Sequence, residues 1–357
     1  MTTKSSIVDA EKLTNFATRA LQQVGVPEED ARITANILVA TDLRGVSSHG
    51  VAHLAPFYIK RIREGYINVK PNIKVFSQAP ATAILDGDRG LGFVVGYRAM
   101  MEAMQRAEMT GAGFVTVRNS THLGAGAMYA MMALSRNMIG IALTTGGKGM
   151  VAPGGSGRGV CINVISIAVP AKEEAPFVLD MATSVVAAGK LEVALSKGMT
   201  IPEGWAVDKE GKPITDPKKY CEEKGALLPL GGTPQMGSYK GFGLAVAVDI
   251  LCSILSGSVA SPQMLSEPKS LGRGNHFFGA LRIDSFMPAD EFRRAMDGMV
   301  RVYRDLPKAA GVDRIYLAGE IEQEIEKQRR INGIPLDPTI VASLQELAKE
   351  LGIEYAL

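Results

Sequence analysis

The order of periodic segments constrains the fold most, because helical patterns at both ends of the chain flank a long β-rich middle. Residues 7–45 predict two amphipathic helices, and the first has apolar side chains at helical spacing from Leu13 to Val24. Gly25 and Pro27 separate the two helices. The second begins with acidic residues, which favour the positive end of the helix dipole. A third helical pattern, VAHLAPFYIKRIREG, follows.

The middle of the chain changes to short runs of β-forming residues punctuated by glycine. Strands are predicted at IKVFSQ, ATAILDGD, FVTVRN, IGIALTT, INVISIAVP, FVLDM and HFFGALRIDSF. Helices are predicted at VVGYRAMMEAMQRAEMTG and GAMYAMMALSRNM, and KGFGLAVAVDILCSILSG has the composition of a buried apolar helix. Strands and helices do not alternate strictly, so we expect an α/β fold with a mixed, mainly antiparallel sheet instead of a doubly wound parallel one.

The end of the chain returns to helical spacing in ADEFRRAMDGMVRVYRDL and DPTIVASLQELAKELG. We therefore expect two domains. Residues 1–71 and 288–357 would form a discontinuous helical domain from both chain ends, and residues 72–287 would form the mixed-sheet domain.

Charge and cysteine usage exclude several classes of function. The 39 basic and 37 acidic residues are interspersed, which argues against a nucleic-acid binder and leaves a small anion as the expected partner. Cys161, Cys221 and Cys252 have no CxxC spacing, so neither a disulfide framework nor a thiolate metal site is predicted. The N-terminus lacks an apolar signal core, and no apolar run approaches the roughly 20 residues that span a bilayer. We expect a cytoplasmic protein with no membrane partner.

A glycine-rich turn before a predicted helix resembles a dinucleotide fingerprint. Gly90, Gly92 and Gly96 form GxGxxxG, whose amides could approach a pyrophosphate. However, Asp86 and Asp88 would place negative charge beside the phosphates, and no second strand ends in an acid for the ribose. A turn into a packed helix is the favoured interpretation.

The four histidines occur in informative settings. His49 and His53 are four residues apart, as two metal ligands on a helix would be, but no HExxH motif is present and Gly50 weakens a continuous helix. Alternatively, Arg44, Ser48 and His49 form an anion site with a proton donor beside it, or Ser48 simply caps a helix.

His122 follows the predicted strand FVTV and precedes a helix, a position where sites are often built. Imidazole titrates near neutral pH and can deliver a proton to a carbonyl oxygen that receives a hydride. His122 is therefore the preferred acid or base, with a loop hydrogen bond as the alternative. His276 is expected at the start of a strand.

Six ordered motifs resemble those of the type-2 malate/L-lactate dehydrogenase family, which includes ureidoglycolate, sulfolactate and diketogulonate oxidoreductases and some cyclic-imine reductases. The motifs are ATDLRGVSSHG, VRNSTHLGAGA, VLDMATSVVAAGK, IPEGWAVDKEGKPITDP, SYKGFGLAVAVDILCSILSG and YLAGE. The resemblance implies a homodimer whose non-Rossmann mixed sheet binds a nicotinamide cofactor beside a helical domain. It also implies hydride transfer between that cofactor and a small 2-oxo or 2-hydroxy acid.

The resemblance also implies roles for individual residues. His122 would transfer the proton, with Ser48 beside the substrate and His49 as a rival for proton transfer. Arg44 would help to orient the substrate. The residues implied in cofactor binding are Asp180, Met181, Ala182, Thr183, Ser184, Tyr239, Lys240, Gly319 and Glu320.

Departures from the family pattern bear on the substrate. His53 stands where an arginine would clamp a carboxylate, and Phe57 stands where a tyrosine is expected, with Tyr58 next to it. We expect Lys148 in the GGKG run to replace the lost anion contact. Ala188 lies where relatives often carry a basic residue, which favours NAD over NADP. The alternatives are a cyclic-imine reductase and a non-catalytic ligand-binding protein, with a metal-dependent hydrolase as a remote option.

Overall fold

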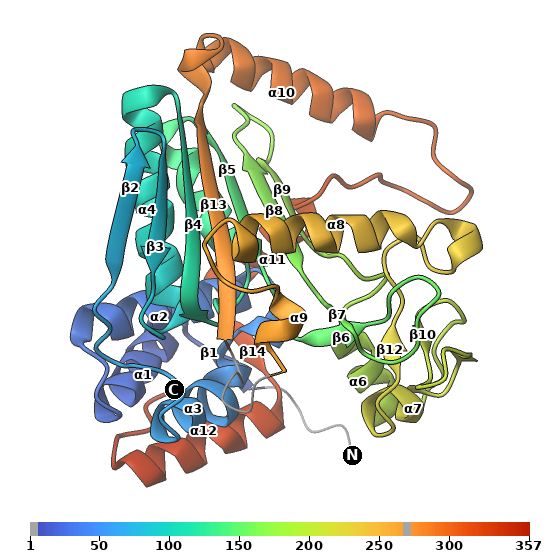
Figure 1. Cartoon of the computed structure of the whole chain (residues 1–357). Helices are drawn as coiled ribbons and strands as arrows, with labels where there is room; N and C mark the ends of the chain where they lie inside the picture. The colour runs from blue at the N-terminus through green and yellow to red at the C-terminus, as the bar shows by residue number, and fades with distance from the viewer. Residues whose placement is uncertain (1–5, 267–272) are drawn as a thin grey trace.

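A seven-stranded sheet forms the centre of the computed structural model, which describes residues 6–266 and 273–357 (Figure 1). The strands are, in spatial order, β2 (Lys74–Ala79), β3 (Thr82–Asp86), β4 (Ala112–Thr121), β13 (Arg273–Arg282), β5 (Met138–Thr144), β8 (Val164–Val169) and β9 (Phe177–Ala182). The β3–β4 pair is parallel, and the other five neighbouring pairs are antiparallel. The predicted mixed, mainly antiparallel α/β fold is therefore confirmed.

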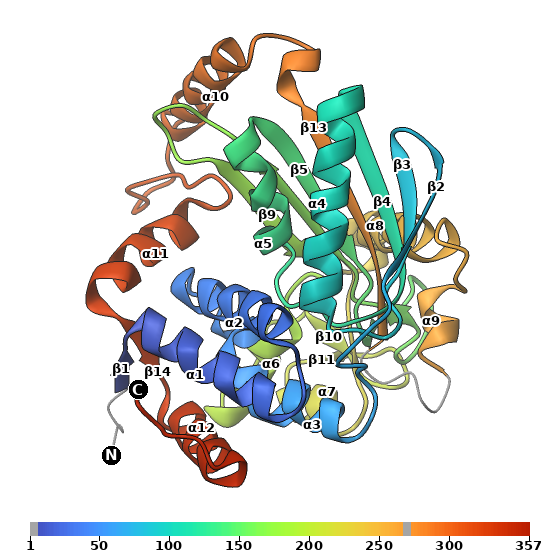
Figure 2. The ribbon, with the colours of Figure 1, turned by 90° about the vertical axis from the view of Figure 1, so that its left-hand side faces the viewer.

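Helices cover both faces of this sheet (Figure 2). On one face lie α4 (Gly92–Thr110), α5 (Ala127–Ala130) and a 3-10 helix at Met131–Arg136. Their buried side chains join those of the strands in one apolar cluster that includes Val95, Met100, Tyr129 and Phe278. The other face is crossed by α8 (Tyr239–Asp249) and a π-helical continuation, Ile250–Ile254.

Segments from the two chain ends share a second apolar core. This core includes side chains from α1 (Ala10–Gln23), α2 (Glu28–Leu43) and α12 (Pro338–Leu351). Leu91, Phe93 and Val94, at the start of α4, also belong to it. A short antiparallel pair, β1 (Ser6–Val8) with β14 (Ile334–Leu336), joins the ends directly. This shared core fits a discontinuous helical domain, whose exact boundaries stay a prediction.

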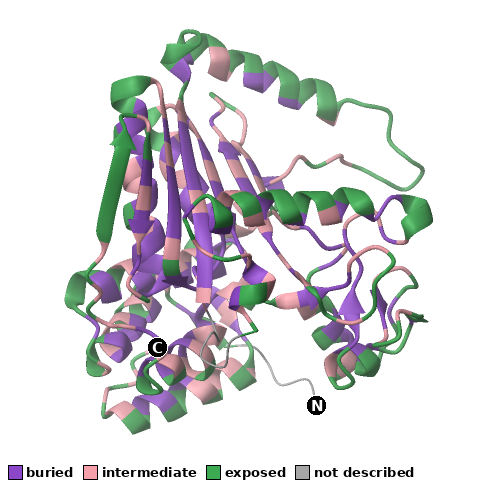
Figure 3. Cartoon of the chain, in the orientation of Figure 1, coloured by how far each residue is buried: buried purple, intermediate pink, exposed green. Residues whose placement is uncertain are grey.

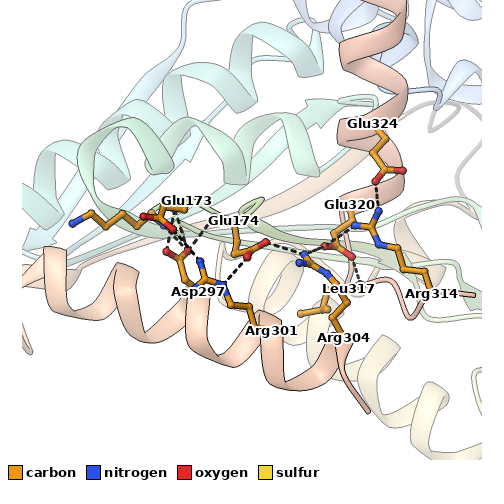
Figure 4. A network of polar contacts seen from close by, with 10 residues as sticks. Glu173, Glu174, Asp297, Arg301, Arg304, Arg314, Leu317, Glu320 and Glu324 are labelled. Atoms are coloured by element: carbon orange, nitrogen blue, oxygen red, sulfur yellow. Dashed lines mark hydrogen bonds and ion pairs between the residues drawn. The ribbon is translucent and has the colours of Figure 1, made fainter. Parts of the chain in front are cut away.

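Near the C-terminus, α10 (Ala289–Arg304) and α11 (Glu320–Asn332) are tied to the β8–β9 turn by charges (Figure 4). Arg301 and Arg304 each contact Glu174 at 2.9 Å. Arg304 also contacts Glu320 at 2.5 Å, so the network joins both helices to the sheet. The charged sequence of α11 gave no apolar stripe, and sequence analysis did not find this helix.

A smaller five-stranded sheet lies beside the main one. Its strands are β11 (Pro213–Ile214), β10 (Ala206–Val207), β12 (Ala226–Leu227), β6 (Lys148–Met150) and β7 (Val160–Cys161). It is accompanied by α6 (Ala188–Ser196), α7 (Pro217–Cys221) and α9 (Ser261–Met264). No helix within residues 6–266 or 273–357 has the length and apolar character needed to cross a membrane.

The expectation that α8 and its continuation are buried is wrong for one side of the helix (Figure 3). Val248 and Cys252 are buried against the sheet, but Ile250 is 51% exposed and Leu255 54% exposed. The sequence is apolar on all sides, so it could not show that only one side meets the sheet of its own chain.

Candidate active site

His122 lies directly after β4, at the end of the large sheet and beside the start of α4. Gly92 makes this close approach possible, because a Cβ atom there would lie 2.4 Å from the carbonyl oxygen of His122. The Gly92 amide donates a hydrogen bond to Thr121 Oγ1 at 2.9 Å. A Cβ at Gly96 would meet the Tyr129 ring at 2.8 Å. Gly92 and Gly96 of the GxGxxxG run therefore allow α4 to pack closely against its neighbours. This agrees with the favoured interpretation of the run as a turn into a packed helix.

Tyr58 holds one ring nitrogen of His122. Its hydroxyl lies 2.7 Å from Nδ1, and either atom of this pair can be the donor, depending on the tautomer of His122. Tyr58 is fully buried, which keeps the pKa of its hydroxyl far above the usual value and the group protonated. The Tyr58 hydroxyl therefore occupies Nδ1 and not Nε2 of His122.

A π-helical turn brings Tyr58 to this position. The third helical pattern forms 3-10 turns at Ser47–His49 and Val51–His53, a π-helix at Leu54–Ile59, and α3 (Lys60–Arg63). A π turn holds more residues than an α turn and so rotates the side chains that follow it. Sequence analysis placed Phe57 in the tyrosine position. In the structure the neighbouring Tyr58 makes the hydrogen bond to His122.

His49 and His53 join His122 in one aromatic cluster. The His49 ring lies 5.6 Å from that of His122 and 6.2 Å from that of His53, measured between ring centroids. Phe57 closes the group, with its centroid 5.3 Å from His122 and 5.6 Å from His53. Ser48 Oγ lies 3.0 Å from His49 Nδ1, so the SHG turn predicted from sequence does meet His122.

Burial keeps this cluster uncharged near neutral pH. Loss of water lowers the pKa of His49, His53 and His122 below the ordinary imidazole value. The pKa of His122 is lowered further by the neighbouring histidines and by Arg61. A neutral His122 is ready to accept a proton, and a bound anion would favour its protonated form.

The Asp42 carboxyl supports the SHG turn. Sequence analysis did not identify this residue. Its Oδ2 accepts the Val51 amide hydrogen at 2.8 Å. A Cβ atom at Gly50 would clash with the Asp42 carboxyl, because it would lie 2.1 Å from Oδ1. Only glycine fits there. Burial raises the pKa of Asp42 to about 7. No repeating pattern in the sequence marks a carboxyl that supports a turn.

Two of the predicted substrate ligands have other partners. Arg44 is buried at the end of α2, where Nη1 donates to Glu326 Oε2 at 3.1 Å. Lys148 lies in the smaller sheet and donates to the Ser266 hydroxyl. No contact recorded among the described residues joins Lys148 to the histidine cluster, and both substrate-binding roles stay predictions.

The end of β9 carries the predicted cofactor residues Asp180 to Ser184. Asp180 Oδ1 accepts a hydrogen bond from Ser166 at 2.6 Å, and Oδ2 accepts one from the Ala127 amide at 3.0 Å. The loop from His122 to Ala127 thus connects the histidine cluster to β9. Thr183 and Ser184 are buried and donate to backbone carbonyls, while Met181 and Ala182 are partly exposed.

The first turn of α8 approaches the same strand end. A Cβ at Gly241 would lie 2.7 Å from the Thr183 carbonyl oxygen. Tyr239 and Lys240 are exposed beside it, and the Lys240 ammonium lies 6.0 Å from the Tyr239 ring centroid. Ser238, at the N-terminal end of this eleven-residue helix, has a buried hydroxyl without a hydrogen-bond partner.

Gly319 and Glu320 lie on the outer side of β9. A Cβ at Gly319 would lie 2.7 Å from the Val178 side chain, so the glycine allows close contact with the strand. Glu320 is buried, and it binds Arg304, Arg314 at 3.2 Å and the Leu317 amide at 2.9 Å. Its carboxylate is occupied by the network of Figure 4, and its cofactor role stays a prediction.

His276 lies apart from this chemistry. It is fully buried within β13, with Nδ1 2.8 Å from Thr144 Oγ1 and Nε2 2.9 Å from Ser120 Oγ. Burial lowers its pKa to about 3. Within the described ranges, no three histidine, cysteine, aspartate or glutamate side chains are grouped so as to hold a metal ion.

Known proteins share this architecture and sequence. The family model for malate/L-lactate dehydrogenase matches residues 8–345. The chain is 43% identical over 349 residues to a malate dehydrogenase of Pyrococcus horikoshii, covering 97% of this chain and 96% of that protein. It is 40% identical over 334 residues to an L-sulfolactate dehydrogenase of Methanocaldococcus jannaschii, covering 93% and 94%.

A crystal structure gives the same result. Malate dehydrogenase from Entamoeba histolytica superposes with a TM-score of 0.94 at 34% identity, and the match covers 99% of this chain and all of that one. Sequence and fold agree over nearly the full length, and the chain belongs to the malate/L-lactate dehydrogenase family.

Proposed function

We propose that this chain is an NAD-dependent oxidoreductase that interconverts a small 2-oxo acid and the corresponding 2-hydroxy acid, with NADH preferred over NADPH. The observation that carries the proposal is the Tyr58 contact with Nδ1 of His122 at 2.7 Å, because it leaves Nε2 to exchange a proton with a substrate oxygen. The relatives named malate and sulfolactate dehydrogenases support this substrate class.

The residues around α8 and β9 fit a nicotinamide dinucleotide. The unpartnered Ser238 hydroxyl, the N-terminus of α8 and the Lys240 ammonium together suit a pyrophosphate. Asp180 and the backbone from Met181 to Ser184 would lie along the ribose and nicotinamide. When bound, the cofactor supplies or accepts the hydride. The absence of a basic group at Ala188 supports NADH.

The chain's own residues would manage the proton and the substrate. In the oxidative direction, neutral His122 takes the hydroxyl proton at Nε2 in the tautomer whose Nδ1–H group donates to the Tyr58 oxygen. In the reductive direction, protonated His122 returns the proton to the carbonyl oxygen. Ser48 and His49 would hold the substrate in line with Nε2, and the Phe57 ring would keep water from the reacting atoms.

We also propose that the chain is a cytoplasmic homodimer. The exposed apolar side of α8 and its continuation supports an interface, and it comprises Leu244, Val246, Ile250, Ile254 and Leu255. Cys161, Cys221 and Cys252 are unpaired thiols, which suits a reducing compartment.

Cofactor oxidation by the purified protein tests the proposed function. We expect NADH turnover with at least one of oxaloacetate, pyruvate, sulfopyruvate or a diketo sugar acid, and weaker turnover with NADPH. Turnover with cyclic imines alone would identify an imine reductase. Measurable NADH binding without turnover would favour another substrate, and no NADH binding would favour a non-catalytic ligand-binding protein.

A further inference from the structure

Arg61 lies beside the histidine cluster and was not found from sequence. It belongs to α3, just after the π turn, and its guanidinium carbon lies 3.3 Å from the centroid of the Phe57 ring. The same ring lies 5.3 Å from the His122 ring. One aromatic side chain therefore separates the cation from the proposed proton donor.

The guanidinium of Arg61 has unused hydrogen-bond donors. Its Nε and Nη1 atoms are buried and have no partner. By contrast, neighbouring Arg63 pairs with Glu350 at 2.7 Å, and buried Arg106 pairs with Glu102 at 2.6 Å. No ion pair is recorded for Arg61 in the described part of the chain. Arg61 is partly buried, and leaving two of its buried nitrogens without a partner costs stability, so its guanidinium is well suited to receive an anion.

His53 provides a second unused polar group on the same side. His53, Phe57 and Arg61 follow one another at intervals of four residues, and the His53 ring lies 5.6 Å from the Phe57 ring. His53 Nδ1 is also buried without a partner. The Arg61 guanidinium and His53 Nδ1 both lie beside the Phe57 ring, which in turn contacts His122. A small anion bound along this ring would reach both Arg61 and His53.

We propose that Arg61 binds the carboxylate of the substrate, with His53 as a second contact and the Phe57 ring as the surface between this anion site and His122. The inference rests on the proposed 2-oxo acid oxidoreductase function and names the residue that recognises the acid. A planar guanidinium offers two parallel N–H groups to a carboxylate. Sequence analysis expected Lys148 to make this contact, but Lys148 lies in the smaller sheet and donates to Ser266, which follows α9.

Charge also links this anion site to catalysis. The positive charge of Arg61 lowers the pKa of both His53 and His122. A carboxylate bound at Arg61 would offset that charge and make protonation of His122 easier. Substrate binding would thereby prepare the proton donor for reduction.

Removing the charge of Arg61 should raise KM for acid substrates and leave the turnover of their uncharged esters almost unchanged. The test compares Arg61→Met and Arg61→Lys with the matched control Arg63→Met, using a 2-oxo acid that the wild type turns over and its uncharged methyl ester. For Arg61→Met we expect KM for the acid to rise at least about tenfold, with kcat/KM for the ester and the Kd of NADH changed less than about twofold. Arg61→Lys should be intermediate, and Arg63→Met should match the wild type. Equal losses for acid and ester, or no loss for the acid, would overturn the inference.

Binding of oxalate to the full-length protein separates this inference from the proposed function. Calorimetry should show oxalate binding to the wild type that Arg61→Met weakens at least about tenfold while keeping the wild-type Tm. If no substrate is turned over but oxalate binding still depends on Arg61, the anion site stands and the proposed reaction falls. If turnover occurs but oxalate binding is independent of Arg61, the anion site is wrong and the reaction stands. Neither turnover nor oxalate binding would overturn both.

Discussion

The Tyr58 hydroxyl lies 2.7 Å from Nδ1 of His122, and this contact occupies one of the two nitrogens of the imidazole. In the proposed reaction, the imidazole would lose and regain its proton at Nε2 during each turnover. A partner on Nδ1 limits rotation of the ring and stabilises one arrangement of its protons. Tyr58 is therefore a positioning residue that acts through His122.

Replacing Tyr58 by phenylalanine should slow turnover without changing substrate affinity much. Tyr58→Phe keeps the buried ring but removes the hydrogen bond, so kcat should fall about tenfold or more while KM changes less than about threefold. The midpoint of the pH–kcat profile should also move, because the hydroxyl no longer stabilises one form of His122. Tyr66→Phe, which changes a partly exposed tyrosine just after α3, is the control. An unchanged pH profile in Tyr58→Phe would show a purely structural role.

The pH dependence of hydroxy-acid oxidation should show the lowered pKa of His122. Oxidation needs the neutral imidazole, and burial holds its pKa below the ordinary 6.5. The value of kcat/KM should therefore stay constant from alkaline pH down to 6.5 and fall only in more acidic buffer. Reduction needs the protonated form, so its kcat/KM should rise as the pH is lowered. An acid limb for oxidation centred at or above neutrality would contradict this assignment.

Asp42 should make the protein less stable as the pH rises. Its pKa is raised from 3.8 to about 7 in the folded state, so the folded chain binds an extra proton between these values. The contribution of Asp42 to stability is lost as the pH rises through that interval. Asp42→Asn cannot ionise and can still accept the Val51 amide hydrogen.

Urea unfolding at pH 4.5, near the lower end of this interval, and at pH 8, above its upper end, measures this effect. The free energy of unfolding of Asp42→Asn relative to the wild type should increase by about 3 kcal/mol between the two pH values. The exposed carboxyl variant Asp305→Asn should show no such change. A difference that is constant with pH would mean that Asp42 does not titrate in this interval.

A charge on the exposed side of α8 should prevent self-association. Ile250 is 51% exposed in the single chain, and Ile250→Glu would place a carboxylate in the proposed interface. Sedimentation should give a dimer for the wild type and a monomer for this variant. Met109→Glu, which changes a 74% exposed apolar side chain on α4, should remain dimeric. A monomeric wild type would refute the interface directly.

The sequence predicts the large sheet well because its strands are long and rich in β-branched residues. It does not predict the five-stranded sheet, whose strands are two or three residues long and show no alternation. It also overstated the burial of the α8 segment, because an apolar sequence does not reveal which neighbour covers each side.

Within the candidate site, sequence motifs located the histidines but not their supporting residues. His122 and His49 lie in recognisable turns, and the structure brings them together. Tyr58 was given no role, because a π turn leaves no periodic signal that distinguishes it from an α turn. The unpaired state of Arg61 depends on which carboxylates fold beside it, which no local pattern records.

Turnover by His122→Ala, compared with the wild type on the same 2-oxo acid and NADH, tests the central claim most directly. The account predicts that kcat falls at least about a hundredfold while the Kd of NADH and the Tm stay close to those of the wild type. A variant that keeps kcat within about threefold of the wild type would contradict the assignment of His122 as the proton donor and acceptor.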